Sequence, residues 1–419
     1  MGITEWKNRL PGYWTSSDYM LAIILFVLLP CIKWVPIFLL MALIFLLRDR
    51  KQLATGHFLG TLFGSSTMKW MLIFFGFHVV GMFWSEDLSA AGMNIEHKLS
   101  LLFLPIFFSL YKSNITIHQS RIIFLLGLGF SSVLLAMVAS YKTFFYQDGG
   151  DFHYWIQSDF SFFMHRSYLA CYMSMGALIA LHAWLKNRHK YMLMGFILFT
   201  VVVVLTASKA GLITLVTGSF VLSVQWVYRY LNNWKVWLLT MLSFLLMGVL
   251  LWSNALLRMR FSSAWNSITS AEVVNNPSKD STQARMIMWS SARSVISRNF
   301  WIGVGTGDGD MELQKENLNR NNTGVAKQKL NAHNQFLNTW VQLGVLSCLV
   351  LVAIFGSLGF YFYKKKSPIS LLILFCFFIN FLFESLLETR AGIVPFCFLT
   401  LLLLTIIRQE SGDYTLSTE

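Results

Sequence analysis

The sequence predicts an all-α membrane protein, a polytopic helical bundle of about twelve transmembrane helices with one long loop outside the bundle that contains short helices. Hydrophobic residues make up 55% of the 419 residues and charged residues only 13%, a composition far more apolar than that of a soluble domain. Apolar runs follow one another along the chain, and one long polar stretch, from Asp280 to Gly344, interrupts them.

Each apolar run predicts one span, given that about 20 residues cross the bilayer core. The first two runs are short and are separated by Pro30 and Lys33, so we expect a helical hairpin, and the sequence leaves open whether both arms cross. The first run lacks a small-residue cleavage site and is expected to remain as a helix. The expected spans are Tyr19–Ile32, Val35–Leu47, Lys69–Trp84, Leu99–Leu110, Ile122–Phe144, Tyr168–Leu185, Tyr191–Thr206, Gly211–Tyr228, Val236–Trp252, Gln335–Tyr361, Ile369–Leu386 and Ile393–Ile407.

This pattern divides the chain into nine spans (1–254), the polar loop (255–334), three further spans (335–408) and a tail (409–419). With the N-terminus inside, alternate connections all carry basic residues, namely Lys7, Arg9, Arg48, Arg50, Lys51, Lys112, Lys186, Arg188, Lys190, Arg229, Lys235, Lys364, Lys365, Lys366 and Arg408. The remaining short connections are acidic or mixed and contain Glu86, Asp87, Asp148, Asp151, Asp159, Lys209, Glu388 and Arg390. The positive-inside rule then predicts cytoplasmic termini, and it places the long loop outside because it governs only loops shorter than about 60 residues.

The formal charge of +13 does not indicate nucleic-acid binding, because the basic residues form small clusters between apolar runs. All five cysteines lie in or beside apolar runs without CxxC spacing. Neither a disulfide framework nor a metal site is expected, and no cofactor motif is present.

The polar loop predicts a surface helix over Thr282–Arg298, started by a capping-box-like pair of Asp280 and Gln283. Arg285, Trp289 and Arg293 are spaced four residues apart and share one face of it, where the two arginines could also be ordinary solvated charges. The following FWIGVGTGDGD lacks the spacing of a nucleotide-binding loop. We interpret its glycines as a tight turn that folds the loop back on the bundle.

His333, in LNAHNQFLNTW, is a candidate general base. The apolar stripe that follows predicts a helix, which places His333 in its first turn at the outer membrane boundary. A helix N-terminus attracts anions and disfavours protonation of an imidazole, and a neutral histidine beside a bound anion suits general base catalysis. The alternative is a histidine that only caps the helix.

Other cations of the outer connections could join His333. Lys209, in LTASKAGL, occupies a very short turn, where a lysine is costly unless it snorkels or meets an anion. Glu388 and Arg390 form the other short turn and are expected to pair with each other. His165 and Arg166 precede the sixth span in a similar position.

The predicted topology gathers distant residues on one face of the membrane. Lys209, Arg285, Arg293, His333 and Arg390 all fall on the outer side. A basic pocket with one histidine at the depth of lipid headgroups suits a lipid-linked pyrophosphate whose glycan is handed to a hydroxyl.

From about Thr206 onward the chain resembles the O-antigen ligase and polymerase superfamily of bacterial envelope glycosyltransferases. The resemblance rests on ASKAG, RMIMWSSA followed by GVGTG, NAHNQFL and ETRAG. It implies an inverting, metal-independent enzyme of the bacterial inner membrane with a periplasmic loop. The family's roles on an undecaprenyl-pyrophosphate donor would fall by position on Lys209, Arg285 and His333, although the family usually has arginine where Lys209 stands.

The function expected from this resemblance is transfer of a glycan from undecaprenyl pyrophosphate to lipid A-core, within the lipid bilayer and without a nucleic-acid partner. His333 and Arg285 would be catalytic, and the donor pyrophosphate would be bound by Lys209, Arg293, Arg390 and Arg166. An O-antigen polymerase and a protein-directed oligosaccharyltransferase remain alternatives. A transporter is disfavoured, because the spans lack the central charges that mark a transport path.

Overall fold

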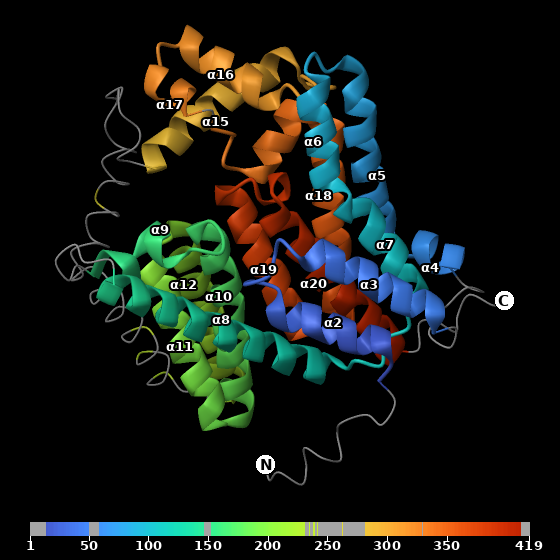
Figure 1. Ribbon diagram of the computed structural model, residues 1–419, viewed down its shortest axis with the longest axis vertical. Helices are drawn as coiled ribbons and strands as arrows, with labels where there is room; N and C mark the ends of the chain where they lie inside the picture. Colours follow the sequence, from blue (N-terminus) through green and yellow to red (C-terminus); the bar gives the residue numbers. More distant parts are fainter. Residues whose placement is uncertain are drawn as a thin grey trace.

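The computed structural model describes residues 14–49, 58–145, 152–230, 281–328 and 330–411, with isolated positions 234, 238, 241 and 262 (Figure 1). The described elements are all helical. They are α2 (Ser16–Val27), α3 (Val35–Arg48), α4 (Phe58–Gly64), α5 (Ser66–Val80), η2 (Gly81–Trp84), α6 (Leu88–Lys98), α7 (Ser100–Leu110), α8 (Ile117–Phe145), η3 (Phe152–Trp155), α9 (Gln157–Phe160), α10 (Arg166–Asn187), α11 (Lys190–Thr206), α12 (Lys209–Tyr230), α15 (Ser281–Arg298), α16 (Gly309–Asn319), α17 (Thr323–Lys327), α18 (Gln335–Lys364), α19 (Pro368–Phe383), η5 (Leu386–Glu388) and α20 (Arg390–Glu410).

Each predicted membrane span that the structure describes overlaps a helix, although α2 ends at Val27 and α19 at Phe383, before the predicted ends at Ile32 and Leu386. The expected span Val236–Trp252, the first part of the polar loop and Asp280 lie outside the described residues. Within the described ranges, 6 helices are long and apolar enough to cross a membrane, and four shorter apolar helices accompany them. The all-helical membrane class is therefore confirmed, whereas the count of twelve crossings stays a prediction.

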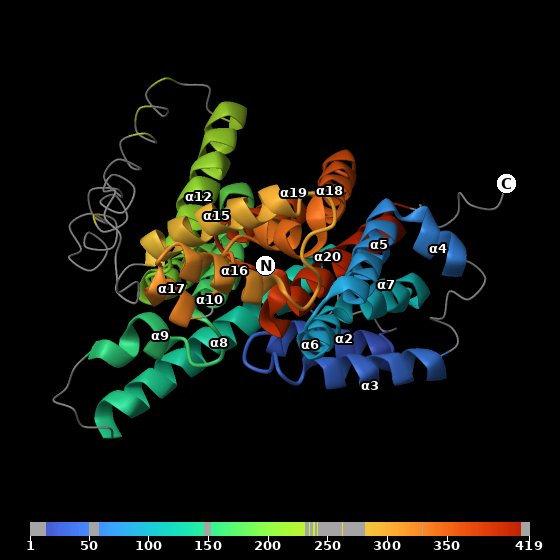
Figure 2. The ribbon, with the colours of Figure 1, turned by 90° about the horizontal axis from the view of Figure 1, so that it is seen from above.

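The first two apolar runs form the expected hairpin. α2 and α3 are 12 and 14 residues long, shorter than the roughly 20 residues of a full span, and they lie side by side (Figure 2). Asp18, fully buried in α2, accepts hydrogen bonds from the Tyr111 hydroxyl and the Asn114 amide. This network fastens the hairpin to the connection between α7 and α8.

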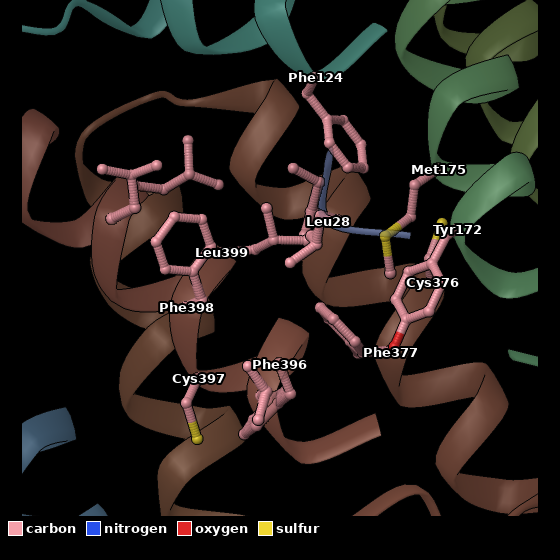
Figure 3. Packing of buried hydrophobic residues seen from close by; sticks show 14 of the residues in the cluster. Leu28, Phe124, Tyr172, Met175, Cys376, Phe377, Phe396, Cys397, Phe398 and Leu399 are labelled. Carbon is pink, nitrogen blue, oxygen red and sulfur yellow. The ribbon is translucent and has the colours of Figure 1, made fainter. Parts of the chain in front are cut away.

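Large apolar side chains fill the centre of the bundle. Figure 3 shows Phe124 of α8, Tyr172 and Met175 of α10, and Phe377 of α19 converging with Phe396 and Phe398 of α20. Most residues of α10 and α20 are buried, so both helices are largely surrounded by other helices. The interior helices therefore form a fixed frame for the connections at their ends.

The helices of the polar loop gather at one end of the molecule, at the top in Figure 1. The predicted loop helix is confirmed as α15, and Figure 2 shows it running across the bundle from α12 toward α18 and α19. A small core of Met288, Val295, Leu313 and Val341 joins α15, α16 and α18. Glu316 of α16 also pairs with Arg298 at 2.6 Å.

The glycine-rich segment after α15 folds back on the bundle, as the sequence predicts. Gly303 and Gly305 have φ angles of 69° and 116°, which L-residues with side chains rarely adopt. Gly303 lies against the backbone of Gln342 and Leu343, and Gly344, where α18 leaves helical geometry (φ 74°), lies against the backbone of Trp301 and Ile302. The Val304 and Gly305 amides donate to the Val341 and Gln342 carbonyl oxygens, each at 2.9 Å. The loop is thus bonded by its backbone to the kink in α18.

The polar loop and the turn between α10 and α11 are predicted to face opposite sides of the membrane. We expect a cysteine at Gln328, exposed after α17, to react with an impermeant thiol reagent in intact spheroplasts. A cysteine at Asn187, exposed at the end of α10, should react only after lysis. The background is the protein with its five native cysteines replaced, and labelling at Asn187 alone in intact cells would overturn the orientation.

Candidate active site

Glu384 holds Arg285 and His333 on its two carboxylate oxygens. Arg285 Nη2 lies 2.6 Å from Glu384 Oε1, and His333 Nδ1 lies 3.1 Å from Glu384 Oε2. Arg285 Nε also donates to the Phe383 carbonyl oxygen at 3.1 Å. Three segments far apart in the sequence, α15, the entry to α18 and the exit of α19, therefore meet at one carboxylate.

The carboxylate is buried and stays ionised. Glu384 is 5% exposed, whereas the side chains of Arg285 and His333 are 16% and 24% exposed. Burial alone would raise the pKa of Glu384, but the hydrogen bond to His333 and the charge of Arg285 outweigh it and lower the pKa to about 2. The site consequently keeps a negative charge on Glu384, between the partly exposed side chains of Arg285 and His333.

His333 lies just before α18 rather than in its first turn, so that expectation was wrong. Asn334 is the N-cap, and its side chain accepts from the Leu337 amide at 3.0 Å. His333 has a φ angle of 46°, an unfavourable conformation for most residues, and its amide donates to Asn331 Oδ1 at 3.0 Å. The local backbone aims the ring at Glu384 instead of along the helix axis.

The contact with Glu384 also sets the tautomer of His333. An ionised carboxylate can only accept hydrogen bonds, so Nδ1 carries the hydrogen that faces Glu384. In the neutral ring, Nε2 then has the free lone pair and can take up a proton. The contact therefore fixes which ring nitrogen of His333 faces the carboxylate.

The two residues that follow His333 are hydrogen-bonded to the end of α19 and to the connection between α19 and α20. Asn334 Nδ2 donates to the Leu382 carbonyl oxygen at 3.1 Å. Gln335 accepts from the Leu387 amide at 2.7 Å and donates to Glu388 Oε1 at 3.1 Å. The start of α18 is thus tied along the whole link between α19 and α20, which fixes His333 relative to Glu384.

Lys209 meets the loop helix one turn before Arg285. Its Nζ donates to Thr282 Oγ1 at 2.5 Å. Residues three apart share a face of a helix, so Thr282 brings Lys209 to the side of α15 that carries Arg285. Ala207, with a φ angle of 47°, ends α11 and makes the tight turn that presents Lys209.

His165 and Arg166 lie near this cluster, at the start of α10. Desolvation lowers the pKa of His165, and the positive charges of Arg166, His333 and Arg285 lower it further, while Glu384 acts in the opposite direction. The charge of Glu384 thus acts on both residues at the beginning of α10. The sequence predicted that His165 and Arg166 lie on the outer side of the membrane, but it did not predict which residues they interact with.

The prediction that Glu388 and Arg390 pair with each other is wrong. Glu388 pairs with the fully buried Lys98 at 2.8 Å, and Arg390 pairs with Glu96. Residues two apart point in different directions, and α6 supplies a partner for each. Arg390 is half exposed in this pair, which directs its guanidinium to α6 and not to Glu384.

Arg293 is likewise separate from Glu384. It is exposed on α15, eight residues beyond Arg285, which corresponds to about 12 Å along the helix. Of the cations expected at the donor, Lys209 and Arg166 thus lie near Arg285. Arg293 is exposed farther along α15, and Arg390 pairs with Glu96 of α6.

Sequence reasoning missed the acidic groups of the site. Glu384 stands inside the expected apolar span Ile369–Leu386, and a lone carboxylate within such a run is a signal for function. Asp310 on α16 was missed as well. Desolvation and the nearby charge of Glu388 raise the pKa of Asp310 to about 6, and Lys98 and His333 oppose that rise. Only the folded chain places Asp310 near His333.

Part of the chain that contributes to this site matches a known protein family. No curated protein matches the sequence. The family model described as O-Antigen ligase matches residues 194–352, which include Lys209, Arg285 and His333 and end before Glu384. Members of this family are membrane enzymes of the glycosyltransferase or ligase type. Over residues 194–352 the chain is therefore similar to the O-antigen ligase family.

Proposed function

We propose that the protein is an O-antigen ligase, which transfers a glycan from undecaprenyl pyrophosphate to a sugar hydroxyl of lipid A-core at the periplasmic face of the bacterial inner membrane. The observation that carries the proposal is the shared carboxylate, because Glu384 holds a candidate base, His333, and a candidate phosphate ligand, Arg285, at one point. The match to the O-antigen ligase family supports the reaction class.

His333 would activate the acceptor. In an inverting displacement, the acceptor hydroxyl oxygen bonds to the anomeric carbon as the bond from that carbon to the pyrophosphate oxygen breaks. The hydroxyl proton passes to Nε2 of His333, since Nδ1 faces Glu384. The negative charge of Glu384 stabilises the imidazolium that forms, as a buried carboxylate does in other histidine-dependent enzymes.

Arg285 and Lys209 would stabilise the leaving group. The bond electrons remain on the pyrophosphate, so negative charge grows there during the reaction, and positioned cations lower the energy of that transition state. The two contacts that fix Arg285 use Nε and Nη2, and neither uses Nη1. Lys209 adds a point charge next to Thr282, one helical turn before Arg285. Arg166 interacts electrostatically with Arg285 and Glu384.

Lys209 is predicted to act through its charge. We expect Lys209→Arg to retain substantial transfer activity and Lys209→Ala to lose most of it, because a cation at the leaving group stabilises the transition state. The measurement is glycan transfer at equal membrane abundance. Thr282→Val serves as the control, since it removes the hydroxyl that contacts Nζ but keeps the lysine. Wild-type activity in Lys209→Ala would reduce Lys209 to a topology anchor.

A deletion strain tests the reaction directly. Lipopolysaccharide with bare core, together with polymer accumulating on the lipid carrier, is the expected result. Core capped by single repeats would instead indicate the O-antigen polymerase, and loss of glycan from proteins would indicate an oligosaccharyltransferase. Envelope glycans that are unchanged in all three assays would contradict the proposal.

A further inference from the structure

A basic pocket lies at the far ends of the helices that build the candidate site. It has a volume of about 350 Å³ and is formed by the start of α5 and the ends of α18 and α20. Its lining includes Thr67, Ser357, Phe360, Lys364, Lys365 and Arg408. Three of these side chains are cationic, and none of those residues is acidic.

The position of this pocket separates it from the candidate active site. α18 begins beside His333 and contains 30 residues up to Lys364, a length of about 45 Å at 1.5 Å per residue. A bilayer with its headgroup regions is about 40–45 Å thick. The pocket therefore lies at the opposite membrane face, which the charge pattern predicts to be cytoplasmic, and it plays no part in the proposed transfer.

The polar half of the pocket suits a phosphate group. Arg408 Nη1 donates to the Thr61 carbonyl oxygen at 3.3 Å, which holds its guanidinium at the pocket. Lys365 Nζ lies 5.9 Å from the centre of the Tyr361 ring. α5 starts at Ser66, which also lines the pocket, and helix starts attract anions through their amide groups and partial positive charge. Cations, hydroxyl groups and a helix start thus converge on one cavity.

The apolar half distinguishes a lipid from a soluble phosphate. Phe360 is 69% exposed and Tyr363, three residues on, is 75% exposed on α18. Aromatic side chains at this level of a membrane helix lie at the boundary between acyl chains and headgroups. A ligand whose phosphate enters the pocket can extend its acyl chains along this exposed aromatic surface.

We propose that this pocket binds the headgroup of an anionic phospholipid from the membrane leaflet opposite the candidate active site. Basic pockets between membrane helices on the cytoplasmic side recognise lipid phosphates in this way. The lysines and Arg408 bind the phosphate, Thr67 and Ser357 close the inner end through their 2.9 Å hydroxyl contact, and Phe360 contacts the acyl chains.

Native mass spectrometry of the full-length detergent-purified protein tests this proposal with short-chain phosphatidylglycerol as the probe. We expect one molecule to bind the wild type and the double variant Lys364→Gln/Lys365→Gln to bind about 25-fold more weakly, at about five-fold per lost charge. The double variant Lys364→Arg/Lys365→Arg keeps both charges and should bind as the wild type does. Lys366→Gln, an exposed neighbour outside the pocket lining, should bind as the wild type does.

Two further probes identify the source of the phosphate. Zwitterionic phosphatidylcholine and glycerol phosphate should each bind at least ten-fold more weakly than phosphatidylglycerol. Equal binding of glycerol phosphate would show a site for a soluble phosphate and overturn the lipid assignment. Equal loss of binding in Lys366→Gln would show a diffuse charge effect and overturn the pocket. Because these readouts measure binding alone, they are independent of the proposed transferase activity.

Discussion

Replacement of His333 by alanine is expected to lower glycan transfer by about 10²–10⁴-fold, the range that a general base contributes. The reason is the proton of the acceptor hydroxyl, which would have no recipient once Nε2 is removed. Binding of the donor should change much less, because Arg285 and Lys209 remain in place. The measurement is transfer by purified protein in liposomes under saturating donor and acceptor.

A neighbouring amide provides the matched control for His333. Asn331, whose side chain accepts from the His333 amide at 3.0 Å, supports the backbone without touching Glu384. We expect Asn331→Ala to lower transfer far less than His333→Ala. A His333→Ala protein that is folded and as active as the wild type would remove His333 from the reaction.

The second large effect is expected at Glu384, which acts as a positioning residue. Glu384→Gln removes the charge that fixes Arg285 and the Nδ1 tautomer of His333, and loss of such a carboxylate costs up to about 10⁴-fold in the turnover of a comparable histidine site. Turnover should therefore fall much more than substrate affinity. The pH at which activity is half maximal should also move, because a neutral amide stabilises the imidazolium less than a carboxylate does.

The variant Glu384→Asp tests whether the negative charge alone is sufficient or whether the length of the side chain also matters. Aspartate keeps the negative charge but is one methylene shorter, so it is expected to retain more activity than glutamine and to leave the pH profile nearer that of the wild type. A purely structural Glu384 would instead lower the amount of folded protein in both variants and leave the pH profile of the remaining activity unchanged. That outcome would contradict the positioning role.

The helical class could be predicted from sequence because apolar runs dominate the chain, and α3 and α15 were predicted to within one residue of their observed bounds, whereas α2 ends five residues earlier than predicted. Helix lengths were harder to predict, since a run of apolar residues does not reveal where polar flanks extend or shorten the helix. Leu99, for example, has helical angles between α6 and α7. The two helices therefore follow one another almost without a break, whereas the sequence predicted only the apolar second half.

The site was only half predictable. The cations were visible because basic residues in short outer connections stand out against apolar spans. Their partners were not visible, because pairing depends on tertiary contacts. Lys98 is fully buried against Glu388, although nothing in its neighbourhood distinguishes it from a flanking lysine. Glu384 was hidden within an apolar run, and its role depends on α15 and α18 arriving at the same point.

The central claim is that Arg285 and His333 act as one site through Glu384. The most direct test is the double-variant cycle of Arg285→Ala and His333→Ala, measured as transfer by folded protein in liposomes. Residues that act as a unit lose activity non-additively. We therefore expect each single variant to abolish most transfer and the double variant to be scarcely worse than either. Losses that multiply in the double variant would show two independent contributions and contradict the shared site.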